Sequence, residues 1–321
     1  MHKINFTPEE YAQAARSNKI SLLLLPLMAS KDTLKYMTGM PNSRMITPLG
    51  SVESNAQFAP FKADRGSAGS TELKVRELKT YLGNVCEDFV PNDYIQTLLG
   101  GNAAILGNGQ VQAPTAKMVL ACVAKSLGHK LNEVIFTAKR NAEGNTTGDL
   151  FDGFTTIAER EIDAANISVD KGNLLVLEEA ITEANACDML KAVERSADPI
   201  LRAQEKFLYC DPAIADAYND NYLLTHSGIV YNKAFDQPYV EGSGHRTTIV
   251  PLPCLAGSKY MFLTPQFNMV YGYDNTADET NIEVLRKNHW TLSMGAAMFF
   301  GTEFRTLDKR YLKVIKLADQ A

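Results

Sequence analysis

A long apolar stretch near the middle of the chain restricts the possible folds more than any other feature. Pro114 opens an alanine-rich run, and Gly128 follows its last apolar residue, so we expect a helix over residues 114–127. Its few clear polar positions are Lys117, Lys125 and Ser126. A helix that is apolar on most faces is normally buried between layers. Residues 131–138 then predict a strand packed beside it.

Composition allows a sizeable core and excludes some partners. The 321 residues are 45% hydrophobic and 21% charged, which is typical of one or two globular domains. The net charge of −5, without any Lys/Arg cluster longer than a pair, argues against tight electrostatic gripping of nucleic acid. The five cysteines are odd in number, widely spaced and without a CxxC motif, so we expect reduced core thiols and a cytosolic compartment.

Residues 20–29 are the one membrane-like segment. The run is too short to span a bilayer, it contains Pro26, and it follows the acidic pair Glu9 and Glu10. We therefore expect a buried arm segment here, with neither a signal peptide nor a membrane anchor. A short helix is expected before it, over residues 7–17. Residues 39–69 lack a sustained period and indicate an extended arm or long loop.

Residues 71–89 alternate in the manner of strands. Leu73 and Val75 alternate with Glu72, Lys74 and Arg76, and the phase then shifts, which predicts two strands or one bulged strand. One face of such a ribbon would be heavily charged. We expect the ribbon to project from the body, with its charged face meeting the opposite charges of a neighbouring subunit.

The second half of the chain has the order of an open α/β lobe followed by long strands. The expected helices and strands are helix 182–195, strand 205–210, helix 212–224, strands 247–252 and 259–263, one or two long strands over 281–299, and a last pair over 305–317.

Candidate catalytic and binding motifs are weak. The Gly107-Asn108-Gly109 turn before the apolar helix could open a nucleotide site, but the third glycine of that motif is replaced by Gln112. Asp149 and Asp152 could hold a cation, yet two acids three residues apart beside glycine more often shape a turn.

Other acids and the histidines do not complete a site either. Asp274, Asp278 and Glu279 resemble a partial calcium loop without its glycine and twelfth-position acid, which favours a solvated turn. The five histidines form no metal or protease motif and are expected at surfaces. Because no base, nucleophile and oxyanion donor come together, the sequence predicts no enzyme, no cofactor and no metal.

Three stretches carry a resemblance to a known family. They are GDLFDGFTTI at 148–157, the segment 172–222 with NLLVLEEAITEANACDMLKAV and KFLYCDPAIADAY, and the segment 250–274 with PLPCLAGSKYMFLTPQFNMVYGYD. In this order, after an arm, a ribbon and an apolar helix, they resemble the major capsid proteins of tailed phages, which have the Hong Kong 97-like fold.

The resemblance implies an α+β fold with five parts. These are an N-terminal arm (1–52), an extended loop (53–91), a peripheral domain with a long spine helix over 114–129 (92–167), an apical α/β domain (168–247), and a return through the apical core to peripheral strands (248–321).

The implied function is an icosahedral shell around double-stranded DNA. The implied partners are copies of the same chain in pentamers and hexamers, with portal and scaffolding or decoration proteins. DNA would be enclosed without sequence-specific binding, and the location would be the virion, assembled in the bacterial cytoplasm. Two alternatives stay open: an encapsulin-like compartment with the same fold, and a cytosolic nucleotide-binding enzyme.

Overall fold

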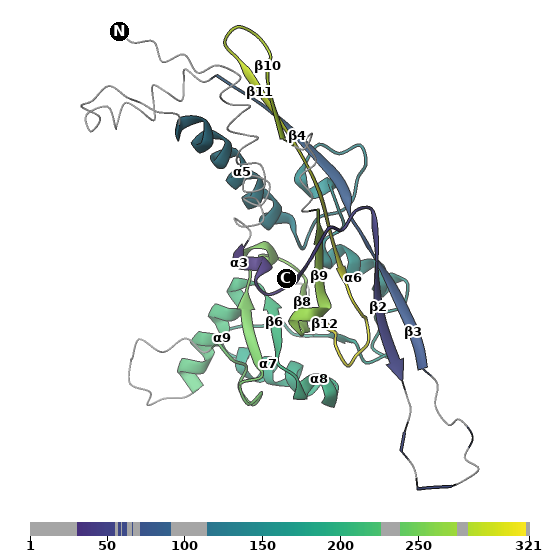
Figure 1. The fold of residues 1–321 in the computed structure, drawn as a ribbon. Coiled ribbons are helices and arrows are strands. Elements are labelled where there is room, and N and C mark those ends of the chain that lie inside the picture. Colours follow the sequence, from purple (N-terminus) through teal and green to yellow (C-terminus); the bar gives the residue numbers. More distant parts are fainter. Residues whose placement is uncertain are drawn as a thin grey trace.

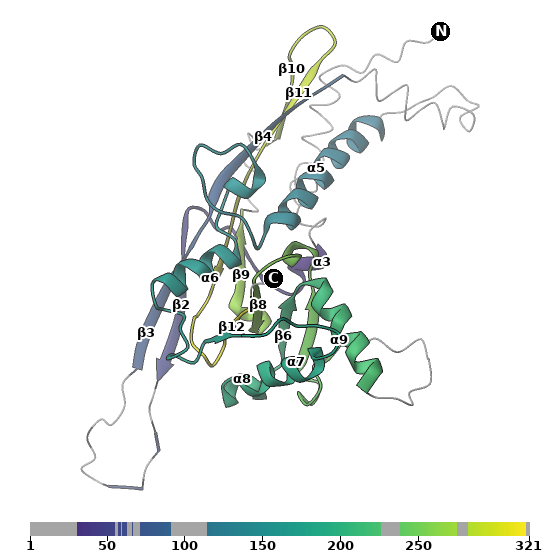
Figure 2. The same cartoon turned by 180° about the vertical axis from the view of Figure 1, so that it is seen from behind.

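The structure is a computed structural model that describes residues 31–54, 57–58, 60–62, 66, 71–90, 114–225, 238–274 and 282–318. Figures 1 and 2 show a long sheet along one side of the molecule, a helix lying beside its upper half, a compact lobe of sheet and helices, and a two-stranded ribbon that projects downward.

The first sheet is built around one long strand, β11. This strand pairs antiparallel with β4 along one side and with β10 and then β9 along the other, and β9 pairs parallel with β1. The strands are β1 (Thr38–Pro41), β4 (Tyr81–Phe89), β9 (Met269–Tyr273), β10 (Ile282–Arg286) and β11 (Leu292–Phe304).

The second sheet forms the compact lobe, with strand order β5-β12-β8-β6-β7. Its strands are β5 (Leu174–Val176), β6 (Lys206–Cys210), β7 (Thr247–Pro251), β8 (Tyr260–Thr264) and β12 (Lys313–Lys316). The helices of this lobe are α7 (Ala186–Arg195), α8 (Pro199–Ala203) and α9 (Pro212–Thr225). The remaining helices are α3 (Lys31–Leu34), α5 (Pro114–Val134), α6 (Phe154–Asp163) and the 3-10 turns Thr147–Asp149, Pro253–Leu255 and Gln266–Asn268.

Alternate residues of the second sheet pack into two different hydrophobic cores, one on each face of the sheet. In β8, Met261 and Leu263 pack with α7 and α9, whereas Phe262 faces a second core on the other side of the sheet. That second core includes Phe136, Phe154 and the end of β11. Because both faces are covered, the middle residues of these strands are apolar instead of alternating, as expected for a doubly buried sheet.

The central helix is longer than the sequence predicts. It runs from Pro114 to Val134, so Gly128 lies inside it, and the strand expected over residues 131–138 is wrong. A glycine inside a helix costs about 0.5–1 kcal/mol, but each fully buried aliphatic side chain contributes about 1.5–3 kcal/mol. Leu131 in the last turn and Ile135 just beyond it are both buried, and their burial outweighs the glycine.

Several other expected elements are confirmed with adjusted ends. Strand β6 and helix α9 match their expected positions, as do β7 and β8, and residues 281–299 do contain two strands, of which β11 extends to Phe304. Helix α7 begins at Ala186 because Thr182 and Asn185 form a hydrogen-bonded turn before it. The pair expected over 305–317 is wrong, since that stretch contributes the single strand β12.

The amino-terminal third contains strands that the sequence did not reveal. Residues 39–69 were expected to be an arm or loop, but β2 (Ile46–Ser54) lies within them and pairs antiparallel with β3 (Thr71–Lys79). Residues 71–89 do contain two strands, β3 and β4, but the prediction that this segment forms the ribbon by itself is wrong, because β3 pairs with β2. Strand β4 leaves the ribbon and joins β11 in the first sheet (Figure 1). The division of the chain at residues 53 and 91 stays a prediction, and the ribbon strands run across the first of these boundaries.

Candidate assembly surfaces

The ribbon of β2 and β3 has one face toward the body and one toward solvent. Side chains alternate along β3, so Arg76 and Leu78 share a face, and Leu73 and Val75 share the other. Leu78 is fully buried against Leu49 and Val270, which fixes the body-facing side.

The outward face carries a stripe of apolar side chains near its tip, contrary to the sequence prediction. Val52 and Leu73 are paired across the two strands and are 69% and 68% exposed, and Val75 is 53% exposed. The sequence predicts that the charged face meets a neighbouring subunit, but Arg76 on that face bonds to the body of its own chain. Alternation predicted two faces correctly and could not tell which of them the body would cover. A stripe of this kind is a candidate surface for another protein.

The ribbon joins the body where two glycines allow close approach. The chain passes from β3 to β4 through one residue, Thr80, which is buried and donates its hydroxyl to the carbonyl oxygen of Ser43. A β-carbon at Gly301 of β11 would lie 2.1 Å from the carbonyl oxygen of Lys79, and one at Gly272 would collide with Leu78. Glycine at both sites lets the base of the ribbon sit directly on β9 and β11.

Arg76 fastens the ribbon to the body through three contacts. Its Nη2 donates to Glu161 Oε1 of α6 at 2.9 Å and to Glu303 Oε1 of β11 at 2.8 Å. Its Nε donates to the carbonyl oxygen of Phe304 at 3.1 Å. Both carboxylates are more than nine-tenths buried. Arg160 lies 3.7 Å from each of them and supplies a second positive charge.

The two carboxylates differ in how readily they take a proton. Burial raises the pKa of Glu303, and the charge of Arg76 and its hydrogen bond only partly oppose that rise. Burial also acts on Glu161, but hydrogen bonds from Arg76 and Asn166 outweigh it and hold the pKa of Glu161 below its usual value. On acidification, Glu303 therefore takes a proton first.

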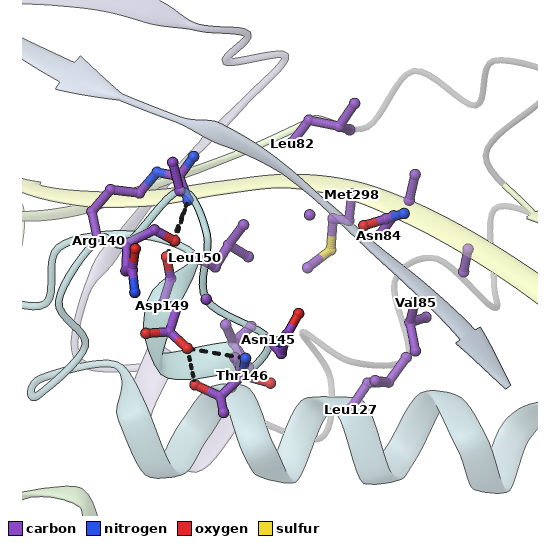
Figure 3. Close-up of a pocket in the computed structure, with 18 of the residues that line it drawn as sticks. Leu82, Asn84, Val85, Leu127, Arg140, Asn145, Thr146, Asp149, Leu150 and Met298 are labelled. Carbon is purple, nitrogen blue, oxygen red and sulfur yellow. Dashed lines mark hydrogen bonds between the residues drawn. The ribbon is translucent and has the colours of Figure 1, made fainter.

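A hollow of about 440 Å³ lies between the central helix, β4 and the turn that follows α5 (Figure 3). Leu82, Leu127 and Met298 give it an apolar side. Arg140 closes the other side, where its guanidinium lies 4.6 Å from the ring centre of Tyr81. Such a half-apolar hollow at the surface can receive a side chain from another protein.

The hairpin of β10 and β11 ends in an ordered loop that displays a tryptophan. The side chain of Asn288 accepts from the backbone nitrogens of Trp290 at 2.9 Å and Thr291 at 2.7 Å, and the backbone nitrogen of Lys287 donates to the Thr291 carbonyl oxygen. Trp290 is 72% exposed. Lys287 forms an ion pair with Asp88 of β4, which ties the loop to the neighbouring strand.

The acids weighed as cation ligands shape turns instead. Asp149 accepts from the backbone nitrogen and the hydroxyl of Thr146, and these bonds, led by the hydroxyl, lower the pKa of Asp149. Asp152 accepts from the backbone nitrogen of Arg140 at 2.9 Å and pairs with Arg160 at 3.0 Å. Over the part of the chain that the structure describes, three or more metal-ligating side chains gather nowhere.

The cysteines divide into two groups, which corrects the expectation that all are core residues. Cys187, Cys210 and Cys254 are buried, and burial raises the pKa of Cys210 to about 12 and of Cys254 to about 11. Cys86 and Cys122 are exposed, because they lie on the surface sides of β4 and α5.

The histidines that the structure describes are exposed, as expected: His129, His245 and His289. Asp274 pairs with Arg44 at 2.5 Å. The helix over 7–17, the apolar run 20–29, the Gly107-Asn108-Gly109 turn, His2, His226, Asp278 and Glu279 lie outside the described residues. Within the described ranges, no helix is both long and apolar enough to cross a bilayer.

Comparison with solved structures identifies the architecture. A chain of the satellite phage P4 procapsid, solved with its size determination protein, matches with a TM-score of 0.58 at 11% identity, covering 92% of this chain and 91% of that one. A chain of the cyanophage A-1(L) capsid matches with a TM-score of 0.53 at 13% identity, covering 92% and 93%. The capsid of the native GTA particle gives 0.51 at 11% identity, covering 90% of each chain.

This chain has the Hong Kong 97-like capsid fold. No protein-family model and no curated protein matches its sequence. The capsid fold is thus recognisable here from the order of helices and strands and from three short stretches, at an identity where most side chains have changed.

Proposed function

We propose that the protein is the major capsid protein of a tailed double-stranded DNA phage, or of a particle derived from one, and that it assembles with itself into a closed icosahedral shell. The observation that carries the proposal is the ribbon, whose outward apolar stripe stays exposed among the residues that the structure describes. The fold that it shares with phage capsid chains over nine-tenths of their length supports the same conclusion.

Assembly into a shell would cover the exposed apolar stripe of the ribbon. A ribbon that lies across the next subunit buries its stripe in a head-to-tail contact, and contacts of this kind close into rings when the rotation allows. Repeating the same contact in rings of five and six builds a closed shell. The role is structural, without catalysis, and the partners beyond the chain itself are a portal and scaffolding or decoration proteins.

The interior would hold DNA without reading its sequence. The chain carries a net charge of −5 and no long basic cluster, so the shell would repel the packaged phosphates more than it binds them. The DNA would then stay mobile inside. Assembly would take place in the bacterial cytoplasm, before the particle becomes a virion.

Electron microscopy of the purified protein tests the proposal. We expect closed particles of uniform size, and particles from an infected or induced host should protect DNA from nuclease. Particles filled with an enzyme in place of DNA would favour the encapsulin-like alternative. A compact monomer by light scattering at every concentration, salt and pH would contradict shell assembly. A thermal shift with dinucleotides would favour the enzyme alternative.

A further inference from the structure

We propose that Trp290, in the loop between β10 and β11, inserts into the hollow beside α5 of a second copy of this chain. The hollow is the one of about 440 Å³ between α5, β4 and the turn that follows α5. The inference rests on the proposed function, because it names one contact through which copies of this chain would assemble.

The loop that carries Trp290 is well ordered within its own subunit. The side chain of Asn288 accepts from the backbone nitrogens of Trp290 and Thr291. Arg286 donates from Nε to the carbonyl oxygen of Asn288 at 3.3 Å and from Nη2 to that of His289 at 3.1 Å. Trp290 is nevertheless 72% exposed. A loop that is already ordered loses little conformational freedom on binding, and tryptophan is among the residues that most often anchor an interface.

The hollow of its own chain is out of reach of Trp290. Trp290 is not among the residues that line it. Strand β11 pairs with β4 without interruption from Leu292 to Phe300, so the hairpin cannot fold back to bring its loop over the hollow. A protruding apolar side chain and a hollow at different places on one chain fit each other only between copies, in a head-to-tail contact.

The hollow suits an indole ring in size and in chemistry. Its volume of about 440 Å³ lies in the range of pockets that enclose ligands larger than an indole. Leu82, Leu127 and Met298 provide the apolar side, and a methionine sulfur makes favourable contacts with aromatic rings. Asn145, which is exposed, extends into the hollow from the turn (Figure 3). Its amide oxygen can accept a hydrogen bond from the indole nitrogen, which is a donor only.

The charges around the two features are complementary. Arg286 places a positive charge at the base of the loop, and the turn beside the hollow carries Glu143 and Asp149. The positive charge of Arg140 faces its own subunit, where Nη1 donates to two carbonyl oxygens of the same turn. A basic loop that approaches an acidic turn favours this orientation over others.

Tryptophan fluorescence tests the contact, because Trp290 is the only tryptophan of the chain. Leu82→Glu places a charge on the apolar side of the hollow, at a position that is 58% exposed and therefore tolerant of substitution. Trp290→Ala has no tryptophan but keeps the hollow intact. When these two variants are mixed, all tryptophan emission comes from the Leu82→Glu chain, and every intact hollow belongs to the other chain.

The emission of Leu82→Glu alone should be that of an exposed indole. As Trp290→Ala is added, we expect a saturable shift to shorter wavelength and protection from quenching by acrylamide. The matched control partner is the double variant Trp290→Ala with Leu82→Glu, which also lacks tryptophan but has a blocked hollow, and it should give no shift.

Shell formation provides a second measurement. Trp290→Ala should raise the subunit concentration needed for shells by roughly 30-fold or more, as expected when an anchoring residue is removed from an interface. The control is Leu285→Ala, an exposed leucine of β10 in the same hairpin, which should leave that concentration unchanged.

Each outcome decides the proposal. No shift with either partner would overturn it, and equal shifts with both would place Trp290 in a different contact. Should Leu82→Glu fail to fold, Asn145→Arg blocks the hollow from its exposed side and takes its place. Normal shells from Trp290→Ala would overturn this contact and leave the proposed function standing. A saturable shift in the mixture, without shells from the wild type, would overturn the proposed function and leave the contact standing.

Discussion

The sheet of the compact lobe and the ribbon differ in how they cover the apolar side chains of their strands. Phe262 in β8 is fully buried, with ring centres 5.9 Å from Phe136 and 5.8 Å from Phe304. Leu73 in β3 is 68% exposed, and its cross-strand partner Val52 is 69% exposed. The lobe completes its core within one chain. The ribbon leaves its outward apolar side chains exposed, and we propose that a second chain covers them.

Truncating one side chain in each region should give the largest contrast. Phe262→Ala removes a ring at the centre of the core and should lower the free energy of unfolding by about 3–5 kcal/mol. Leu73→Ala should change it by about 0.5 kcal/mol or less, as at other exposed positions. Chemical denaturation of the isolated subunit measures both. Equal losses would mean that the ribbon belongs to the core of its own chain.

A buried ion pair in the lobe and an exposed ion pair on the ribbon allow a second comparison of the two regions. In the lobe, Lys206 and Glu194 are both buried and lie 2.9 Å apart, and Thr247 donates to the same carboxylate. Lys206→Met should cost about 3–5 kcal/mol, because it leaves a buried charge without its partner.

The matched pair on the ribbon is Lys79 and Glu77, which are 3.7 Å apart and more than half exposed. Lys79→Met should cost about 0–1 kcal/mol. Urea titration of both variants gives the comparison. A small loss for Lys206→Met would show that water reaches the buried pair.

The central helix α5 was only partly predictable. Its start at Pro114 and its apolar character follow from the sequence, but its end does not. Gly128 is a local signal to stop, and the burial of Leu131 beyond it depends on a core assembled from distant segments. The local sequence pattern shows the cost of the glycine in the helix, but it does not show the stability gained when Leu131 is buried in the tertiary structure.

Leu131→Ala should lower the free energy of unfolding by about 2–5 kcal/mol, since Leu131 is 2% exposed. The measurement is the unfolding midpoint in denaturant, with His129→Ala on the exposed side of the same helix as its control. An unchanged midpoint for Leu131→Ala would mean that the helix ends at Gly128 after all.

The ribbon shows a second limit of sequence reasoning. Alternation in residues 71–79 predicts a strand with two faces, and this prediction is confirmed. Which face the body covers depends on Glu161 and Glu303, which lie 85 and 227 residues away from Arg76 along the chain. Nothing near Arg76 in the sequence signals these partners. The strand β2 was missed because Pro48 and Gly50 interrupt its pattern, although its pairing with β3 is continuous.

The pH dependence of stability should reflect the two carboxylates at the base of the ribbon. Because the pKa of Glu161 is lowered in the folded state, its contribution is present above its unfolded pKa and is lost as the pH falls through the folded value. Glu303, with a raised pKa, acts in the opposite direction, and its destabilising effect disappears on acidification.

Glu161→Gln should therefore flatten the loss of stability in acid, and Glu303→Gln should steepen it. Thermal melts across the acidic range measure both slopes, with Glu77→Gln as an exposed control. Identical slopes in all three variants would mean that the buried acids are not linked to folding. This effect is smaller than those of the core substitutions, because the two shifts oppose each other.

The most direct test of the account separates folding from assembly. Leu73→Asp and Val75→Asp together place two charges on the outward stripe of the ribbon, where the subunit has no core to disturb. We measure the melting temperature of the subunit and count shells by electron microscopy in the same preparation. The account predicts near-normal melting and a loss of shells, because charges forced into an apolar interface cost several kcal/mol. Normal shells would contradict it, and an unfolded subunit would show that the stripe is covered by its own chain.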